Sequence, residues 1–169
     1  DQAIYIPSPF DPDKRRIMIG LDVSTKYTRR SVKEYRKVAD YIRQLFKAHP
    51  GNYMVFLPSY KMLQEVYEQM TVEDCSAMEL LCQEQNMNEA DREAFLKYFS
   101  SKKNVVAFCI MGGIFSEGID LTGDRLIGSV VVGPGLPQVC NERKIMMDYF
   151  NVRKSVKVYE DSAADGFKY

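Results

Sequence analysis

The chain has 169 residues, enough for one domain with a sizeable core and too few for two ordinary domains. Its apolar share of 46% is that of a globular protein, and its formal net charge of zero excludes a general polyanion binder, so any contact with nucleic acid depends on a local arrangement of charge. No apolar run is long enough to cross a bilayer, and residues 1–10 lack the order of a signal peptide, so we expect a soluble, cytoplasmic protein.

The first half of the chain predicts two strands and two helices. After a proline-rich beginning, the apolar run at residues 16–23 predicts a short strand. Residues 24–51 give the clearest helix, because apolar side chains recur at helical spacing until a Pro-Gly pair ends the pattern. Residues 53–58 form a compact apolar run, typical of a strand buried on both faces, and residues 59–70 again show one apolar helical face.

The second half continues this alternation with three strands and two helices. In the order strand, helix, strand, strand, helix they occupy residues 78–84, 86–101, 104–113, 125–135 and 138–153. Asn88 and Asp91 resemble an N-cap and its capping box. The apolar positions of the last helix are Val139, Ile145, Met146, Tyr149 and Phe150. Strands that alternate with helices predict an α/β fold, a parallel sheet with helices on both faces.

Three polar or glycine-rich loops follow predicted strands, at residues 58–61, 112–120 and 133–137. Parallel strands have their carboxyl ends at one edge of the sheet, where ligands bind in such folds. We therefore expect these loops to form one continuous surface.

Two glycine patterns resemble nucleotide-binding motifs but fail on inspection. Residues 123–130 have the glycine spacing of a P-loop, but Ser129 stands where lysine is required and the glycines precede a strand. Residues 133–138 follow a strand as a dinucleotide fingerprint does, but Gln138 replaces the third glycine. The sequence therefore contains no self-sufficient nucleotide site.

The cysteines do not indicate a metal site. Cys75, Cys82, Cys109 and Cys140 form no C-x-x-C pair, and His49 is the single histidine. Cys109 lies within an apolar run and is most simply a small buried hydrophobe.

Ser59 lies where a strand meets a helix, a natural anion-binding point, and Tyr60 and Lys61 add a stacking surface and a positive charge. A simple N-cap serine is the alternative, and on spacing alone it is favoured. The basic stretch from Lys26 to Lys47 offers Arg29 and Arg30 as phosphate contacts, although a solvated helix face is the commoner explanation for such a run.

The stretch "GGIFSEGIDL", residues 112–121, places glycines and carboxylates directly after a predicted buried strand. Its simplest explanation is a strand-to-helix corner, with Gly118 giving the backbone room and Asp120 satisfying local N–H groups. Without further knowledge this structural explanation is favoured over a binding site.

Three segments together resemble the second motor domain of the DinG/XPD-type helicases of superfamily 2. They are "SPFDPDKRRIMIGLDVSTKYTRR", "YMVFLPSYKMLQEV" and "FCIMGGIFSEGIDLTGDRLIGSVVVGPGLP". The resemblance covers nearly the whole chain, with "MVFLPSYK" similar to helicase motif IV and "GGIFSEGID" to motif V. It implies a RecA-like domain of residues 1–169, the second of two lobes that close on ATP while they hold single-stranded DNA.

The resemblance also implies roles for individual residues. Gly118 and Asp120 approach the nucleotide and its partner arginine, and Glu117 helps to hold the two lobes together. The expected DNA-binding residues are Ser59, Tyr60, Lys61, Gly113 and Ser116. Contacts of this kind hold phosphates and do not read bases, so binding independent of sequence is expected.

The cofactors implied are ATP and Mg²⁺, bound mainly by a first lobe with the P-loop and the metal-binding acid. The resemblance further implies 5′ to 3′ movement and an arginine-bearing motif VI beyond a segment like "DGFKY". We therefore expect a piece of a longer protein that has no ATPase activity by itself. The cysteines of the family's iron–sulfur cluster belong to the first lobe, so no metal is expected here. Two alternatives are a stand-alone nucleotide- or phosphate-binding module and a degenerate lobe used for protein interaction.

Overall fold

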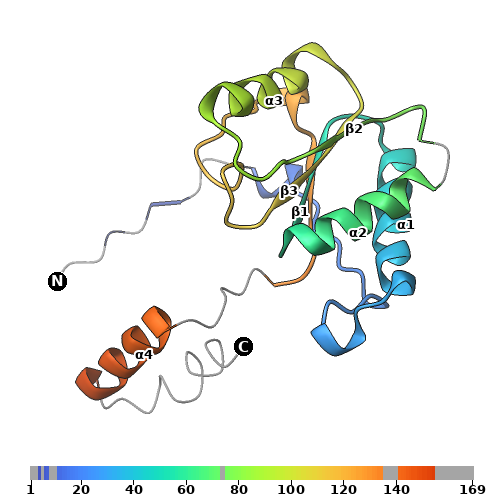
Figure 1. Ribbon diagram of the computed structural model, residues 1–169. Coiled ribbons are helices and arrows are strands. Elements are labelled where there is room, and N and C mark those ends of the chain that lie inside the picture. The colour runs from blue at the N-terminus through green and yellow to red at the C-terminus, as the bar shows by residue number, and fades with distance from the viewer. Residues whose placement is uncertain (1–3, 5, 8–10, 73–74, 135–140, 155–169) are drawn as a thin grey trace.

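A four-stranded parallel sheet forms the centre of the computed structural model, which describes residues 4, 6–7, 11–72, 75–134 and 141–154. The strands are β1 (Tyr53–Leu57), β2 (Glu79–Cys82), β3 (Val105–Ile110) and β4 (Gly128–Val131). Their order across the sheet is β2-β3-β1-β4, and every neighbouring pair is parallel. This arrangement confirms the predicted parallel α/β fold (Figure 1).

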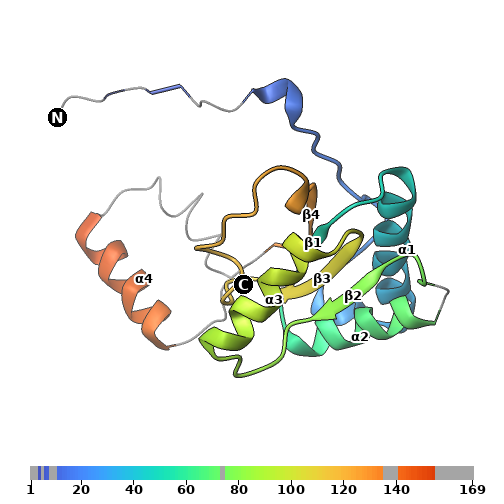
Figure 2. The same cartoon turned by 90° about the horizontal axis from the view of Figure 1, so that it is seen from above.

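Helices cover both faces of the sheet, as predicted. α1 (Val32–Ala48) and α2 (Tyr60–Thr71) pack on one face, and α3 (Glu89–Ser101) covers the other (Figures 1 and 2). The connection from β1 to β2 and the connection from β2 to β3 cross the sheet in opposite directions. Because such crossovers are right-handed, their helices α2 and α3 lie on opposite faces.

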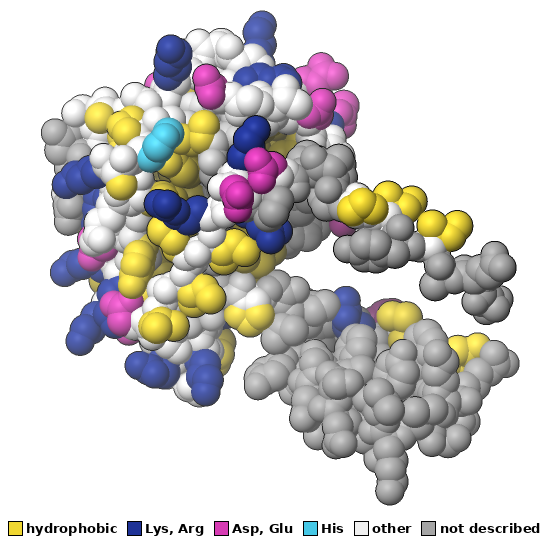
Figure 3. Space-filling view, turned by 180° about the vertical axis from the view of Figure 1, so that it is seen from behind, with side chains coloured by type: hydrophobic (Ala, Val, Ile, Leu, Met, Phe, Trp, Pro, Cys, Tyr) yellow, Lys and Arg dark blue, Asp and Glu magenta, His cyan; other side chains and the backbone are white. Residues whose placement is uncertain are grey.

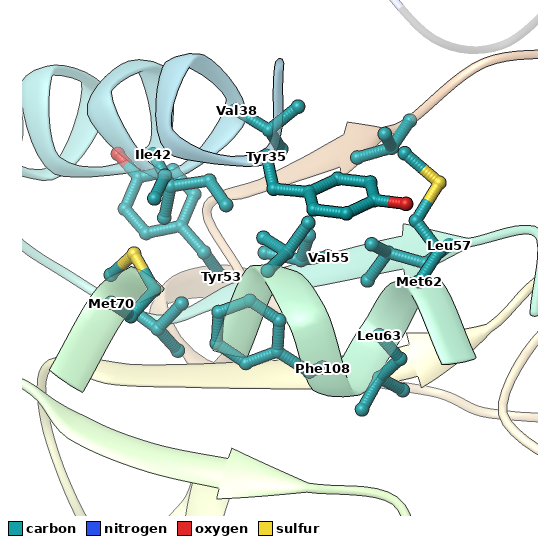
Figure 4. Close-up of a cluster of buried hydrophobic side chains, with 14 of the residues drawn as sticks. Tyr35, Val38, Ile42, Tyr53, Val55, Leu57, Met62, Leu63, Met70 and Phe108 are labelled. Atoms are coloured by element: carbon teal, nitrogen blue, oxygen red, sulfur yellow. The ribbon is translucent and has the colours of Figure 1, made fainter. Parts of the chain in front are cut away.

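The two central strands, β1 and β3, alternate their side chains between two apolar clusters. Val55 and Phe108 pack with α1 and α2, as Figure 4 shows, whereas Met54 and Ala107 face α3. All four are completely buried. This explains why the predicted strands at residues 53–58 and 104–113 read as continuous apolar runs without polar alternation.

Polar side chains cap the amino ends of the three packed helices. Ser31 and Ser59 each accept a hydrogen bond from the backbone N–H three residues on. Asn88 accepts from Asp91 N at 3.0 Å while Asp91 Oδ2 accepts from Asn88 N at 3.0 Å. The last pair confirms the predicted capping box.

The predicted strand at residues 16–23 is wrong. No described strand pairs with this segment, and Ile17, Ile19 and Leu21 are 72%, 78% and 90% exposed. Polar contacts hold its end against α1 instead, with Lys37 Nζ donating to Asp22 O at 2.6 Å. An apolar run makes a strand only where a neighbouring backbone supplies hydrogen bonds, and sequence alone does not reveal that neighbour.

The predicted last helix is present as α4 (Asn141–Lys154), but its described apolar positions are not part of the core. Ile145, Met146 and Tyr149 are exposed, because α4 lies apart from the sheet (Figures 1 and 2). Val139 lies outside the described residues. The helical spacing predicted the helix correctly.

The chain between β3 and β4 crosses the sheet as a loop, residues 111–127. The described structure contains one short 3-10 helix here, Gly123–Arg125, and no α-helix. The expected strand-to-helix corner is therefore wrong. Apolar side chains replace a covering helix, because Phe115 is completely buried against Phe95 of α3, with ring centroids 4.4 Å apart. The loop is thus part of the packed structure.

Candidate nucleic-acid and nucleotide interface

The carboxyl ends of all four strands lie at one edge of the sheet, because the strands are parallel. Residues 58–61 follow β1, residues 112–120 follow β3, and residues 133–134 follow β4. The structure therefore brings together the three loops that the sequence predicted at one edge. Residues 135–137 of the third loop lie outside the described part of the chain. We call this surface the carboxyl edge.

The start of α2 presents hydrogen-bond donors at the carboxyl edge. Ser59 Oγ accepts from Met62 N at 3.3 Å, which confirms the N-cap alternative. The hydroxyl retains its own hydrogen for donation, so the N-cap role does not exclude an anion contact. The N–H groups of Tyr60 and Lys61 lie in the first helical turn, where no intrahelical acceptor reaches them. Lys61 is exposed beside them.

Gln83, directly after β2, connects α2 to the end of β3. Its Oε1 accepts from Ile110 N at 2.9 Å, and its Nε2 donates to Tyr60 Oη at 3.1 Å. Tyr60 Oη in turn donates to Glu84 O at 3.4 Å. The residue patterns gave no sign of this role, because Gln83 appeared only as a polar residue at the end of a predicted strand.

The first half of the loop after β3 is tied to the carbonyl group of Ile110. Gly113 N and Ser116 Oγ both donate to Ile110 O, each at 3.0 Å. A side chain at position 113 would begin 3.0 Å from that oxygen and 3.3 Å from Gln83 Nε2, so the close approach favours glycine. In this conformation, a phosphate that binds Gly113 N or the Ser116 hydroxyl has to displace the Ile110 carbonyl.

The same loop is also held by α3. Arg92 of α3 donates from Nη2 to Gly118 O at 2.9 Å and from Nε to Ile114 O at 3.4 Å. Gly118 has a φ of +68°, a left-handed conformation that favours glycine. Glu117 and Asp120 flank it with exposed carboxylates. Arg92, like Gln83, was absent from the residues that the sequence suggested.

Residues 24–30 form a fourth segment at the carboxyl edge. A Cβ on Gly133, just after β4, would lie 2.7 Å from Thr25 Oγ1, so the Thr25 side chain lies against the backbone of Gly133. The Arg30 guanidinium lies over the exposed ring of Tyr27, 5.6 Å from its centroid. Arg29 is exposed in the adjoining 3-10 helix, Tyr27–Arg29. Arg30 Nε donates to Thr25 O at 3.3 Å, so the structure links Arg30 through Thr25 to the loop after β4.

The basic stretch that continues along α1 is partly structural. Arg43 is buried and donates to Asp40 Oδ1 at 2.5 Å and to Gln69 O at 3.0 Å. Glu34 is also buried, and donation from Ser24 N lowers the pKa of its carboxyl group. Lys33, Arg36 and Lys47 are exposed, so the solvated-face explanation holds for these members of the stretch. Lysine and arginine side chains also occur at many places on the face shown in Figure 3.

Within the described residues, no group of three or more His, Cys, Asp and Glu side chains is placed to hold a metal ion. Cys109 is completely buried, as the sequence predicted, and burial raises the pKa of its thiol to about 12. In the same part of the chain, no helix combines the length and the apolar character that a membrane span requires.

Comparison with known proteins defines the class of this domain. A family model described as the helicase C-terminal domain matches residues 42–168, so the chain belongs to the helicase C-terminal domain family. The chain is 28% identical over 120 residues to the ATP-dependent DNA helicase XPD of Sulfolobus acidocaldarius, covering 70% of this chain and 20% of that protein. It is 24% identical over 161 residues to a probable ATP-dependent helicase of Methanocaldococcus jannaschii, covering 90% and 24% of the two chains.

Solved structures show the same fold. A structure described as "XPD_APO" matches 83% of this chain and 28% of its own with a TM-score of 0.63 at 21% identity. One described as "XPD_Helicase" matches 83% and 24% with a TM-score of 0.64 at 22% identity. These matches confirm the expected RecA-like α/β fold. The family model and the helicase relatives confirm the resemblance to an XPD/DinG-type motor domain. The chain spans about a fifth to a quarter of the length of its curated relatives.

Proposed function

We propose that this domain is the second motor lobe of an ATP-dependent DNA helicase that moves 5′ to 3′ along single-stranded DNA. ATP hydrolysis takes place at the interface with a first RecA-like lobe of the same protein. The observation that carries the proposal is the single loop, residues 112–120, in which Ser116 is bound to the end of β3 and Gly118 is bound to Arg92 of α3.

The DNA side of the proposal consists of the start of α2 and the first half of that loop. Ser59, Tyr60 and Lys61 offer a hydroxyl group, an aromatic ring and an ammonium group, and Gly113 and Ser116 lie across the hydrogen-bond network from Tyr60. The groups of residues 59–61 suit phosphates and stacked bases of any sequence. Gly113 N and the Ser116 hydroxyl can bind a phosphate once it displaces the Ile110 carbonyl. Arg29 and Arg30 extend the same edge with positive charge.

The nucleotide side of the proposal consists of Glu117, Gly118 and Asp120. The exposed carboxylates of Glu117 and Asp120 accept hydrogen bonds from a sugar hydroxyl group or from an arginine. Gly118 lets a ligand approach the backbone. ATP with Mg²⁺ supplies the phosphoryl group that is transferred to water. The described residues lack a cluster that fits Mg²⁺, so in our proposal the metal-binding acid belongs to the first lobe.

Coupling between the two sides follows from how the loop is held. Residues Gly113 and Ser116 are bound to β3, whereas Gly118 is bound to α3 through Arg92. A shift of the nucleotide side is therefore transmitted over a few residues to the DNA side. Catalysis of phosphoryl transfer depends mainly on positioning and charge stabilisation, so a displaced loop changes the rate. Bound ATP favours the closed arrangement of the two lobes, and hydrolysis of ATP lets the lobes open again.

Strand displacement by the full-length protein tests this proposal. The substrate is a DNA duplex with a single-stranded tail on the 5′ or the 3′ side, with ATP and Mg²⁺ present. We expect displacement of the 5′-tailed duplex only, at rates that do not depend on tail sequence. A stand-alone phosphate-binding module or a degenerate lobe displaces neither duplex, and displacement of the 3′-tailed duplex alone contradicts the proposed direction.

A further inference from the structure

Gln83, directly after β2, is a buried residue whose polar atoms contact two further elements at the carboxyl edge, β3 and α2. Its side chain is 4% exposed. The backbone N–H donates to Phe108 O at 2.9 Å, Oε1 accepts from Ile110 N at 2.9 Å, and Nε2 donates to Tyr60 Oη at 3.1 Å. One side chain therefore links β2, β3 and α2.

The orientation of this amide is determined by its partners. The backbone N–H of Ile110 can only donate, so the amide oxygen of Gln83 has to face it. The amide nitrogen then faces Tyr60 Oη, whose hydrogen is directed to Glu84 O at 3.4 Å. Because the Ile110 N–H can only donate and the Glu84 carbonyl oxygen can only accept, the network has a single arrangement and resists rotation of the Gln83 side chain.

The same network continues into the loop after β3. Ile110, whose N–H is bound by Gln83, uses its carbonyl oxygen to accept from Gly113 N and Ser116 Oγ. The glycine at 113 also leaves just enough room for Gln83 Nε2. Displacement of Gln83 therefore disturbs Tyr60 on one side and residues 113–116 on the other.

We infer that Gln83 is a positioning residue that holds residues 59–61 and 112–116 in a fixed relation, so that one nucleic-acid strand spans both. This inference rests on the proposed function, because it assigns both segments to the same single-stranded ligand. Gln83 itself is buried and acts through Tyr60 and Ile110.

The domain offers a matched control at the opposite edge of the sheet. Asn52, directly before β1, is a second buried amide, with Oδ1 accepting from Val105 N at 2.9 Å and Nδ2 donating to Arg125 O at 3.1 Å and to Phe99 O at 3.2 Å. Gln83→Met and Asn52→Leu each replace a satisfied amide by an apolar side chain of similar shape. Both leave a backbone N–H without its partner, so both are expected to destabilise the fold.

The affinity of the full-length protein for single-stranded DNA distinguishes the two variants. We expect Gln83→Met to weaken binding of a fluorescent oligonucleotide about fivefold, the factor that corresponds to one lost hydrogen bond, and Asn52→Leu to leave the affinity unchanged. Equal losses in both variants would show that general stability causes the effect, and unchanged affinity of Gln83→Met would overturn the inference.

Tyr60→Phe provides a test that does not depend on a change in the core. It keeps the ring that stacks on bases and removes only the oxygen that Gln83 binds. If Gln83 acts through Tyr60, the double variant with Gln83→Met and Tyr60→Phe loses less affinity for single-stranded DNA than the two single variants lose together. Fully independent losses would contradict the inference.

Amide hydrogen exchange distinguishes failure of the inference from failure of the proposed function. In the absence of DNA, Gln83→Met should speed exchange at residues 113–116 more than at the rest of the sheet. If the protein binds no single-stranded DNA but this local change occurs, the proposed function is wrong and the positioning role stands. If exchange at these residues is unchanged, the positioning role is wrong.

Discussion

Ser59 combines a structural and a proposed functional role in one hydroxyl group. Its oxygen accepts from Met62 N, and its hydrogen remains available to a phosphate. The N-cap could be predicted from the sequence, because a serine before an apolar helical pattern is a known signal. The roles of Gln83 and Arg92 could not be predicted in this way, because they bind backbone groups of Ile110 and Gly118 that only the fold brings close.

Ser59→Asp separates the two roles. Aspartate caps a helix about as well as serine, so the free energy of unfolding should change little, whereas its negative charge repels a phosphate. We expect weaker binding of single-stranded DNA by the full-length protein, by the same factor for oligonucleotides of different sequence. A loss confined to one sequence would indicate that the residue reads bases.

Lys61→Gln should weaken binding in a similarly sequence-independent way and reduce the salt dependence of the affinity, because one phosphate contact is lost. Lys103→Gln is the control, since Lys103 is exposed just before β3, at the other end of the strand. Titration at several salt concentrations measures both effects. Equal behaviour of the two variants would contradict a specific contact at Lys61.

At the scale of elements, the sequence predicted the helices and strands that are marked by a local pattern of apolar residues. The strands β1 to β4 and the helices α1 and α3 lie within predicted segments, and α2 and α4 each end one residue beyond theirs. The error concerns a partner, because the run at residues 16–23 has no pairing strand in the described part of the chain. Ile145, Met146 and Tyr149 of α4 also lack packing partners in the core, since they are exposed. The crossover between β3 and β4 was also unexpected, since Phe115 fills the place of a covering helix.

Phe115→Ala tests whether this crossover is part of the folded core. The side chain is completely buried against Phe95, so we expect a loss of about 3 kcal/mol in the free energy of unfolding, measured with denaturant. Ile114→Ala, at a neighbouring position that is 41% exposed, should cost less than about 1 kcal/mol. A similarly small loss for Phe115→Ala would mean that the loop is not anchored by packing.

At the scale of the whole molecule, the parallel sheet explains why distant segments form one surface. The carboxyl ends of β1, β3 and β4 share an edge, so loops that are far apart in sequence lie together. Patterning predicted that shared edge, whereas the roles of its residues came from the resemblance to helicases. The loop from Gly113 to Asp120 lies between the two proposed ligands, and coupling between them is the central claim.

ATP turnover by the full-length protein, with and without single-stranded DNA, tests coupling most directly when wild type is compared with Asp120→Ala. Asp120 is exposed, so the substitution should leave the fold and DNA affinity unchanged. We expect single-stranded DNA to stimulate turnover by the wild-type protein and to stimulate Asp120→Ala at least about tenfold less, a change of about 1.4 kcal/mol in the barrier. Equal stimulation of both proteins would contradict the claim that this loop couples DNA binding to hydrolysis.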